Sequence, residues 1–486
     1  MTNQFSQILQ SSKEVGSITQ VFRSIVYVDG LPGATANEAV VFENGDMGQI
    51  MALALGYCEV LLFSRDNLRV GTKVARLGKA MEIGVGEGLL GKILDPSGKP
   101  IISKSAIGTS EVRRVDTVPV GLTSRDVVHL PLETGFSVVD LLVPLGIGQR
   151  ELVVGDRKTG KSTFMQGVMY TQALAGSICV YAVIGKRNID LKKVVDFTIE
   201  KKINSQTVIV GSTATDSAGM VFLTPYTAMT IAEYFRDQGK NVLLVLDDLT
   251  THAQYYREIS LQARRFPGRS SYPGDIFYIH SKLLERAGSF KKGTITVLPG
   301  AESIMGDLSG YIQTNLMAIT DGHLFFDTDV FNEGRRPAIN PYLSVTRVGQ
   351  QAQTALLKDL SRQLSRFLVH YQRLKDLVHF GTEFEERVRK DLALGDRIFS
   401  FFNQSIDTLV PVNVSILMVG ALWNGAWSDT TDDKLHQDMT RIAGFYRQDK
   451  SFKDRCDRII RTAKTFQSLI VAMRDQPDLL VTTKNG

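Results

Sequence analysis

The sequence predicts three successive domains: an antiparallel β-barrel, an α/β domain with a mostly parallel sheet, and a helical bundle. The apolar pattern changes twice along the 486 residues, from short β-rich runs to alternating strands and helices, and then to helical periodicity. The composition, 43% hydrophobic and 22% charged, is that of an ordinary globular chain with ample core material. We place the domains at residues 1–82, 83–353 and 354–486.

The first domain is predicted from residues 16–81, where short β-rich runs such as SITQVF, EAVVFE and EVLLFS are punctuated by Gly, Asn and Asp. This spacing is typical of a small antiparallel barrel. Few aromatic residues occur there and no basic residues are interleaved with them, so we interpret them as core rather than as a nucleic-acid-binding platform. They are Phe22, Tyr27, Phe42, Tyr57 and Phe63.

The two following domains differ in periodicity. Residues 82–353 alternate apolar runs, such as ICVYAVIG and TVIVGS, with helical stretches, which indicates a mostly parallel sheet. From Thr354 onward, stretches such as LLKDLSRQLSRFLVHYQRLKDLV have the 3.6-residue period of amphipathic helices. The charged stretch from Glu383 to Lys390 mixes both signs and is typical of a solvated helix face.

Charge and cysteine content exclude several protein classes. The net charge of +5 is spread over 56 cations and 51 anions, which argues against a nucleic-acid partner. The cysteines, Cys58, Cys179 and Cys456, are far apart, so we expect unpaired thiols in a reducing compartment. The longest apolar stretch, Val414 to Trp423, is about half of what a membrane-spanning helix needs. The first residues do not resemble a signal peptide.

The run GDRKTGKS satisfies the GxxxxGK[ST] pattern of a phosphate-binding loop. It follows the apolar run ELVV and precedes the helical stretch TFMQGVMYTQALA, which is the context that this pattern requires. Glycines let backbone N–H groups surround an anion, the helix N-terminus adds partial positive charge, and the lysine adds a full charge. We therefore expect a RecA-like P-loop domain that binds ATP or ADP with Mg²⁺, the metal being held by the serine hydroxyl. The binding residues are Gly155, Asp156, Arg157, Lys158, Thr159, Gly160, Lys161 and Ser162.

Two further patterns concern nucleotide binding. The strand-like run NVLLVLDD ends in Asp247 and Asp248, and an acid at this end of a strand holds magnesium in P-loop proteins, often through water. Asp247 is therefore a candidate metal residue, unless both aspartates simply cap the turn. The segment Gly86–Gly91 matches GxGxxG, but a short strand and a turn follow it instead of a helix, so we assign no dinucleotide site there.

At this point the sequence resembles the α subunit of the rotary F-type ATP synthase. The resemblance covers the chain from about Gly16 to the helical tail, and the family's plan of barrel, nucleotide domain and helical tail agrees with the three domains above. Its most specific blocks are GDRKTGKS, EYFRDQGKNVLLVLDDL, ARRFPGRSSYPGDIFYIHSKLLERAG, GDLSGYIQTNLMAITDGHLFFDTDVFN and GRRPAINPYLSVTRVGQQAQ.

The resemblance implies a complex that couples ATP synthesis or hydrolysis to ion transport. The implied partners are a catalytic β subunit in an alternating three-plus-three ring, a central rotary stalk, a peripheral stalk and, indirectly, an ion-conducting membrane sector. It also implies a peripheral place at the cytoplasmic face of the cell membrane, with no transmembrane segment in this chain and no nucleic acid as partner.

The family's β chain has a catalytic glutamate in a Gly-Glu-Arg motif after the P-loop, where the α chain usually has Gly-Gln-Lys. Here the matching segment is Gly185-Lys186-Arg187, so Lys186 takes that position unless one residue has been deleted. A protonated lysine has no acceptor with which to orient an attacking water. We therefore expect this chain to bind nucleotide without hydrolysing it at an appreciable rate.

Other family positions transfer to the segment after the nucleotide domain's last strands. Arg347, in SVTRVG, matches an arginine finger that reaches the neighbouring β site, and Ser344 matches a position linked to activity. From the residues alone, Arg347 fits a surface or ion-paired arginine better than an arginine finger, and the surrounding motif reverses that preference. Near the adenine base, Arg336 and Pro337 match the family's Gly-x-Arg-Pro segment, and Gln404 matches a glutamine of its tail.

The chain departs from the family at several points. Lys158 replaces a glutamine, Ser162 replaces a threonine, the segment after Ala287 differs, and part of the N-terminal segment that meets the peripheral stalk is not recognisable. These departures favour a divergent α chain, and leave open an F-type-like ATPase coupled to another process. A self-sufficient homohexamer would need a carboxylate near Lys186. A hexameric nucleic-acid translocase would need exposed aromatics and a basic groove on the barrel.

Overall fold

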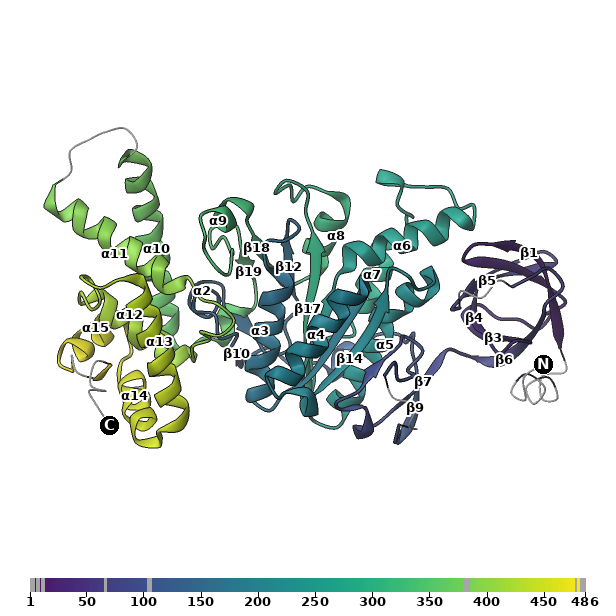
Figure 1. Ribbon diagram of the computed structural model, residues 1–486, viewed down its shortest axis with the longest axis horizontal. Coiled ribbons are helices and arrows are strands. Elements are labelled where there is room, and N and C mark those ends of the chain that lie inside the picture. Colours follow the sequence, from purple (N-terminus) through teal and green to yellow (C-terminus); the bar gives the residue numbers. More distant parts are fainter. Residues whose placement is uncertain are drawn as a thin grey trace. The chain divides into compact units, whose positions relative to one another are not determined.

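The computed structural model (Figure 1) divides into two compact units, which are described separately below. The first unit comprises Met1–Asp126, Ala173–Glu302 and Asp307–Thr320, and the second comprises Val127–Gln172, Ser303–Gly306 and Asp321–Gly486. The residues that the structure describes are 5, 9, 14–64, 68–102, 107–378, 385–476, 479 and 480.

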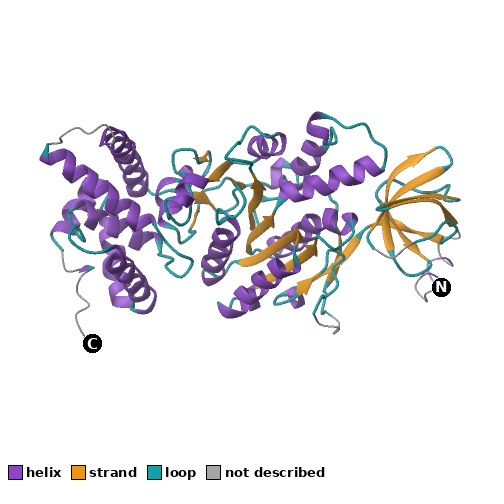
Figure 2. Ribbon diagram, turned by 45° about the horizontal axis from the view of Figure 1, so that its top comes forward, coloured by secondary structure: helices purple, strands orange, loops and turns teal. Residues whose placement is uncertain are grey.

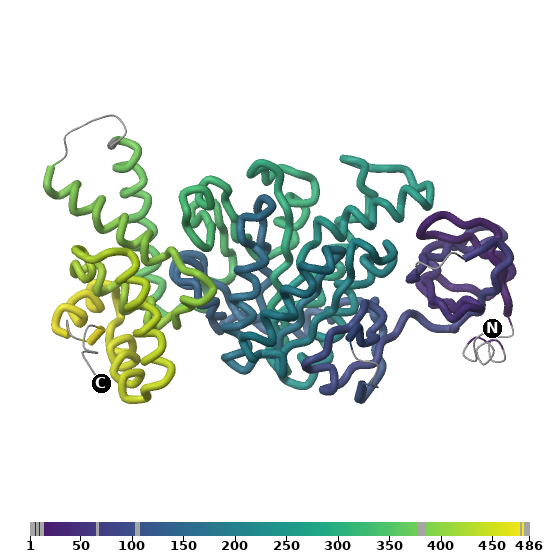
Figure 3. The backbone as a smooth tube through the Cα atoms, viewed as in Figure 1, coloured from purple at the N-terminus to yellow at the C-terminus, as the bar shows by residue number. Residues whose placement is uncertain are grey.

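The first unit begins with a closed six-stranded antiparallel barrel, which confirms the predicted architecture of this region (Figure 2). The backbone closes on itself in the order β1-β2-β5-β4-β3-β6 (Figure 3). Alternate side chains point inward and form a core that includes Ile18, Val26, Phe42, Ile50 and Val60. The strands are β1 (Val15–Phe22), β2 (Ile25–Asp29), β3 (Glu38–Phe42), β4 (Met47–Ala54), β5 (Tyr57–Leu62) and β6 (Lys73–Ala80).

The barrel aromatics behave largely as core residues. Tyr27, Phe42 and Phe63 are buried, whereas Phe22 and Tyr57 are half-buried. The rings of Phe22 and Tyr57 pack at a tilt against Tyr27, with ring centroids 5.1 and 4.7 Å apart. Packing among the aromatic rings therefore accounts for Phe22, Tyr27 and Tyr57, and burial accounts for Phe42 and Phe63.

The rest of the first unit contains a parallel sheet in the order β17-β15-β13-β14-β8. The central strands are buried along nearly their whole length, which explains their continuous apolar runs. The strands are β8 (Ile93–Leu94), β13 (Ile178–Lys186), β14 (Thr207–Thr213), β15 (Asn241–Asp247) and β17 (Thr294–Glu302). The helices are α4 (Asn188–Glu200), α5 (Ala218–Asp237), α6 (Leu249–Gln262), α7 (Ile276–Leu284) and α8 (Tyr311–Ile319).

Smaller elements complete the first unit. A two-stranded ribbon pairs β7 (Glu82–Val85) with β9 (Glu111–Arg114), and β16 (Gly288–Ser289) pairs with β17. The GxGxxG segment forms a single 3₁₀ turn, Glu87–Leu89, followed by β8 and a tight turn rather than by a helix. The segment therefore lacks the helix that a dinucleotide site requires.

The second unit holds the strand that leads into the phosphate loop. β12 (Glu151–Gly155) runs parallel to β18 (Gly322–Phe326), which pairs on its other side with β19 (Val345–Thr346). The loop then opens α3 (Lys161–Leu174). Around them lie α2 (Ser137–Leu142), α9 (Thr328–Asn332) and a ribbon of β10 (Pro131–Leu132) and β11 (Leu145–Gly146).

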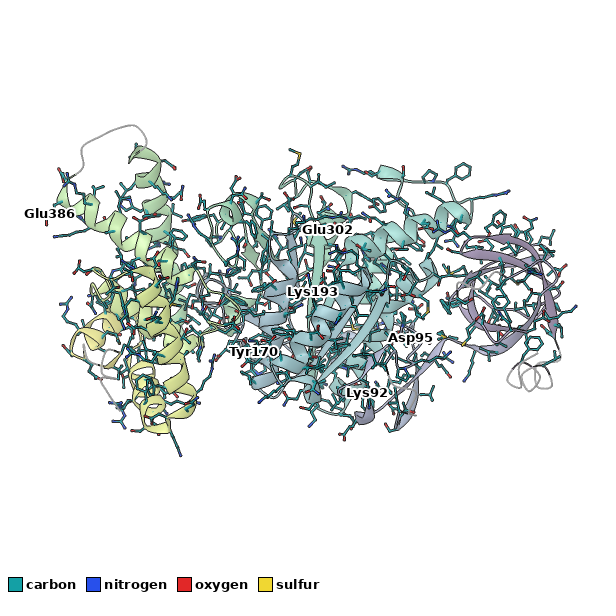
Figure 4. All side chains as sticks on the ribbon, viewed as in Figure 1. Lys92, Asp95, Tyr170, Lys193, Glu302 and Glu386 are labelled. Carbon is teal, nitrogen blue, oxygen red and sulfur yellow. The ribbon has the colours of Figure 1, made fainter. Side chains whose placement is uncertain are left out.

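The C-terminal part of the second unit is helical, as predicted (Figure 2). Its longest apolar run forms α12, which is buried from Val414 to Leu422 and is thus the core helix of a bundle. The charged stretch is exposed from Glu385 to Lys390 apart from the half-buried Val388, with Glu386 in the first turn of α11 (Figure 4), while 383 and 384 lie outside the described residues. The helices are α10 (Ala355–Val378), α11 (Glu386–Phe402), α12 (Val412–Trp423), α13 (Asp432–Gln448), α14 (Lys450–Thr462) and α15 (Phe466–Arg474).

Within the described part of the chain, no helix has both the length and the apolar character needed to cross a membrane. The cysteines at 58, 179 and 456 are buried and form no disulfide. The barrel strands end at Ala80 and the first helix of the tail begins at Ala355, close to the predicted domain boundaries, and the boundaries themselves stay predictions.

Candidate nucleotide-binding site

The phosphate loop is held in shape by its own backbone. Lys161, the first residue of α3, is 9% exposed, and its Nζ donates to the carbonyl oxygens of Gly155 and Asp156, both 2.7 Å away. The hydroxyl of Thr159 donates to the same Asp156 carbonyl at 2.8 Å. The ammonium is therefore held against the loop that the sequence predicts to bind phosphate, where it needs little reorganisation to meet an anion.

Two glycines of the loop are required for different reasons. A Cβ on Gly155 would lie 2.3 Å from the carbonyl oxygen of Phe326, so the close approach of β12 to β18 leaves no room for a side chain. Gly160 has open space around it, but its φ of +98° lies in the left-handed region, which disfavours any residue with a Cβ. The first glycine thus fits the sheet, and the second allows the loop to turn into α3.

Asp156 is half-buried, and its carboxylate anchors the loop to neighbouring segments. Its carboxylate accepts hydrogen bonds from the Ser303 hydroxyl at 2.6 Å, the Gly306 N–H at 3.0 Å and the Thr328 hydroxyl at 3.0 Å. Burial acts to raise the pKa of Asp156, but these hydrogen bonds and the charge of Lys161 hold it below its ordinary value. The carboxylate of Asp156 therefore supports the loop, and a nucleotide contact by Asp156 stays a prediction.

The remaining loop residues are more accessible. Arg157 and Lys158 are exposed, and Ser162 is half-buried as the second residue of α3. The exposed cations add positive potential beside the start of α3, where the helix dipole is also positive. A polyanion is the class of ligand that these charges attract.

In the first unit, the ends of β13 and β15 bring a lysine and two aspartates together. The Nζ of Lys186 lies 2.5 Å from Oδ1 of Asp247 and 3.9 Å from Oδ2 of Asp248. The other oxygen of Asp247 accepts a hydrogen bond from the Tyr181 hydroxyl at 2.9 Å. No sequence pattern pointed to Tyr181, which lies within the apolar run of β13.

The charges of this cluster compensate one another. Burial acts to lower the pKa of Lys186, but Asp247, Asp248 and Glu302, the last residue of β17 (labelled in Figure 4), raise it above its ordinary value. Lys186 therefore stays protonated. Burial, joined by the charges of Glu302 and Asp247, raises the pKa of Asp248 to about 6, although Lys186 acts in the opposite direction.

Asp248 is the N-cap of α6, which agrees, for this one residue, with the alternative interpretation that the aspartates cap the turn. Its carboxylate accepts from the backbone N–H of Thr251 at 2.6 Å. The two aspartates thus have different partners: Asp248 caps a helix, and Asp247 pairs with Lys186.

Arg347 and Ser344 lie in the second unit, at either end of β19. Arg347 is exposed, and its backbone N–H donates to the carbonyl of Asp321 at 2.9 Å, while Arg150 binds the carboxylate of Asp321. The Ser344 hydroxyl donates to the Asn340 carbonyl at 2.7 Å and accepts from the Phe325 N–H at 2.9 Å. The backbone is therefore fixed on both sides of β19, and Arg347 itself is exposed.

The residues predicted to lie near adenine come together. The backbone N–H of Gln404 donates to the Arg336 carbonyl at 2.5 Å, and the Arg336 guanidinium lies 3.5 Å from the ring centroid of Phe331. Gln404 is 1% exposed, and its amide accepts from Ser137 N–H at 2.6 Å and donates to the carbonyls of Gly135 and Thr408. Both amide hydrogens are thus committed to the backbone, and an adenine contact by Gln404 stays a prediction.

A strand, a phosphate loop and a helix beside it define this chain as a P-loop nucleotide-binding protein. Two family models match it: the nucleotide-binding domain of the ATP synthase alpha/beta family over residues 135–346, and the C-terminal domain of the ATP synthase alpha/beta chain over residues 353–474.

Curated relatives narrow the class further. The chain is 39% identical over 429 residues to an ATP synthase subunit alpha of Wolinella succinogenes, and the aligned region covers 87% of this chain and 85% of the relative. It is 39% identical over 421 residues to an ATP synthase subunit alpha of a Sulfurovum species, with 86% and 84% covered. The chain belongs to the family of F-type ATP synthase α subunits, which are nucleotide-binding components of a larger ATP synthase complex.

Proposed function

We propose that this chain holds nucleotide without hydrolysing it and acts on the ATP of a neighbouring catalytic β subunit. The observation that carries the proposal is the contact of Lys186 with Asp247, with Nζ and Oδ1 2.5 Å apart. A catalytic chain of this family needs a carboxylate at that position to orient water. The ammonium has only donors, and it is held by acids that keep it charged.

The nucleotide is ATP or ADP, and the residues fit a magnesium ion that accompanies it. The Ser162 hydroxyl at the start of α3 is a hard oxygen ligand of the kind that Mg²⁺ prefers. The two oxygens of Asp247 already have partners in Lys186 and Tyr181, and a contact of Asp247 with a magnesium ion through water stays a prediction. When bound, the ion would neutralise part of the phosphate charge, and Lys161 and the loop N–H groups would bind the phosphate oxygens.

Arg347 is the residue that we assign to the chemistry, as an arginine finger acting in trans. Its planar guanidinium matches phosphate oxygens as charge develops on them, and its exposure leaves it accessible to another chain. The hydrogen bonds of Ser344 and of the Arg347 backbone fix the segment that carries it. Ser344 is thus a positioning residue in this proposal.

The proposed assembly is an alternating ring of three such chains and three β subunits. A central rotary stalk, a peripheral stalk and an ion-conducting membrane sector complete it, so that the chain lies at the cytoplasmic face of the cell membrane. Support comes from the relatives named above, which are ATP synthase subunits. Lys158 and Lys186 also fit an F-type-like ATPase coupled to another process.

The test is the turnover of the complex with Arg347→Ala. We expect ring assembly and ATP binding near normal, and turnover lower by about 10³ or more, since an arginine finger contributes on that scale. Arg347→Lys should not restore the rate because an ammonium cannot make the planar, bidentate contact. Arg373→Ala, which removes an exposed cation of α10, is the matched control. Unchanged turnover with Arg347→Ala would exclude the role in trans.

A further inference from the structure

A basic hollow lies in the second unit, beside the proposed arginine finger. Its volume is about 950 Å³, and it is lined by the segment from Arg347 to Gln353 and by the first turns of α10. Four cationic side chains and one anionic side chain line it, namely Arg347, Lys358, Arg362, Arg366 and Asp359. The proposed role of Arg347 does not use the other three cations.

Three of these cations form a row on α10. Lys358, Arg362 and Arg366 are spaced four residues apart, so they share one face of the helix and extend over roughly 12 Å. All three are exposed. Like charges at this spacing repel one another in the isolated chain, so the row gains most from an anionic partner.

The only acid in the lining compensates a single cation. The Asp359 carboxylate accepts from Arg362 at 2.6 Å, from the Gln363 amide at 2.8 Å and from the backbone N–H of Phe466 at 2.8 Å. The Phe466 N–H and Arg362 keep the pKa of Asp359 below its ordinary value, so the pair stays ionised. Within the described ranges of the chain, no carboxylate pairs with Lys358 or Arg366.

A buried amide in the lining also lacks an acceptor. Gln353 is 8% exposed, and its Nε2 has no hydrogen-bond partner among the residues that the structure describes. A buried donor without a partner is unfavourable, and an oxygen supplied from outside the chain would satisfy it. The amide and the cationic row therefore require the same kind of ligand, one that carries negatively charged oxygens.

We propose that this basic hollow receives an acidic segment of the neighbouring catalytic subunit. The inference rests on the proposed function, because Arg347 lies in the same lining and is assigned to that neighbour. Exposed cations in a row fit carboxylates spaced along a polypeptide, whereas a phosphate site converges its donors on one anion. The contact adds an electrostatic attraction between the two subunits, which orients them before Arg347 reaches the neighbouring site.

Charge reversal tests the proposal directly. The variant Lys358→Glu with Arg366→Glu removes two cations and leaves the Arg362–Asp359 pair intact. The matched control is Arg387→Glu with Arg389→Glu, an equal charge change at exposed positions of α11. Both variants should keep the circular dichroism and the ATP affinity of the wild-type chain. Association with the catalytic subunit should weaken tenfold or more in the first variant only, and its salt dependence should become shallower.

A second measurement needs no variant. A zero-length carbodiimide reagent applied to the wild-type complex should join Lys358 to an aspartate or glutamate of the catalytic subunit, as identified by mass spectrometry. Wild-type association in the α10 variant, together with no Lys358 cross-link, would overturn the proposal. A second outcome would also overturn the proposal. If the wild-type chain bound inorganic tripolyphosphate tightly, and the α10 variant lost this binding but still assembled normally, the hollow would be a phosphate site.

These outcomes are separable from those of the proposed function. Arg347→Ala changes turnover and leaves assembly intact, whereas the α10 variant changes assembly and leaves nucleotide binding by this chain intact. If Arg347→Ala had no effect but the α10 variant still failed to associate, the finger would be excluded and the docking surface would stand.

Discussion

Lys186 lies at the end of β13 with its ammonium among Asp247, Asp248 and Glu302. The sequence motif Gly185-Lys186-Arg187 indicated only that a lysine stands where the family has a glutamine or a glutamate. Which acid it meets follows from the parallel register of β13 and β15, which pairs Val183 with Asp247 and so brings the ends of the two strands together. The Lys186 side chain thus compensates the charge of a strand-end carboxylate, and in the proposed function it also stands where a catalytic chain orients water.

Removing this lysine should destabilise the chain. Lys186→Ala leaves Asp247, which is 4% exposed, without its cation, and we expect the free energy of unfolding to fall by about 1–3 kcal/mol. This loss is smaller than that for a fully buried ion pair because the lysine side chain is 23% exposed. Lys193→Ala on α4, whose side chain is 67% exposed, is the control and should change stability by less than about 0.5 kcal/mol. Denaturant midpoints measure both, and equal midpoints would contradict the assigned role of the ion pair.

A second residue-scale prediction concerns Gly160. Gly160→Ala forces a Cβ into a φ of +98° and should cost about 1–2 kcal/mol of stability while weakening ATP binding at least tenfold. Gly56→Ala in the barrel is the matched control, with a φ of +88° and equally open surroundings. It should lose similar stability and no ATP affinity. Titration with a fluorescent ATP analogue separates the two, and normal affinity in the Gly160 variant would contradict the role of the loop.

At the scale of elements, two buried histidines join α6 to α7. The Nε2 of His252 donates to the Phe222 carbonyl at 3.1 Å, because that oxygen only accepts, and its Nδ1 therefore accepts from Nε2 of His280 at 3.1 Å. This arrangement needs a neutral His252, because its Nδ1 accepts, whereas His280 can donate from Nε2 in either protonation state. Burial lowers the pKa of His252 to about 4 and that of His280 well below its ordinary value.

The pair predicts a pH dependence of stability. The unfolded histidine titrates near 6.5, so the stabilisation due to neutral His252 is complete above that pH and is lost as pH falls from 6.5 to about 4. The loss for His252 amounts to about 3 kcal/mol over this window. Unfolding free energies at pH 7 and pH 4.5 should differ less in His252→Gln than in the wild type, while exposed His129→Gln keeps the wild-type difference. Equal pH dependence in all three would exclude the effect.

At the scale of the whole molecule, the proposed function predicts different rates of ATP hydrolysis for the purified chain and for its complex. If the proposed function holds, the purified chain should bind ATP and hydrolyse it at less than about 1% of the rate of the complex, because Arg347 would have no neighbouring site to act on and Lys186 would stand in place of a catalytic carboxylate. Addition of the catalytic subunit should give a complex that hydrolyses ATP. Sustained hydrolysis by the chain alone, in a preparation free of partner subunits, would show that its own site is catalytic.

The sequence by itself determined the class of each domain and the phosphate loop. Alternating strands, helical periods and GxxxxGK[ST] are local patterns, and local patterns are fixed by backbone geometry within a few residues. Long blocks such as GDRKTGKS were sufficient to indicate the family, which the relatives confirm.

Only the tertiary structure decided which side chains meet. Asp156 supports the loop through Ser303 and Thr328, Lys186 pairs with Asp247, and the row on α10 shares its hollow with Arg347. Each of these pairings except the row joins residues from separate strands or loops, far apart in the sequence. Periodicity places a side chain on a face, but the packing of the elements determines which other side chain that face meets.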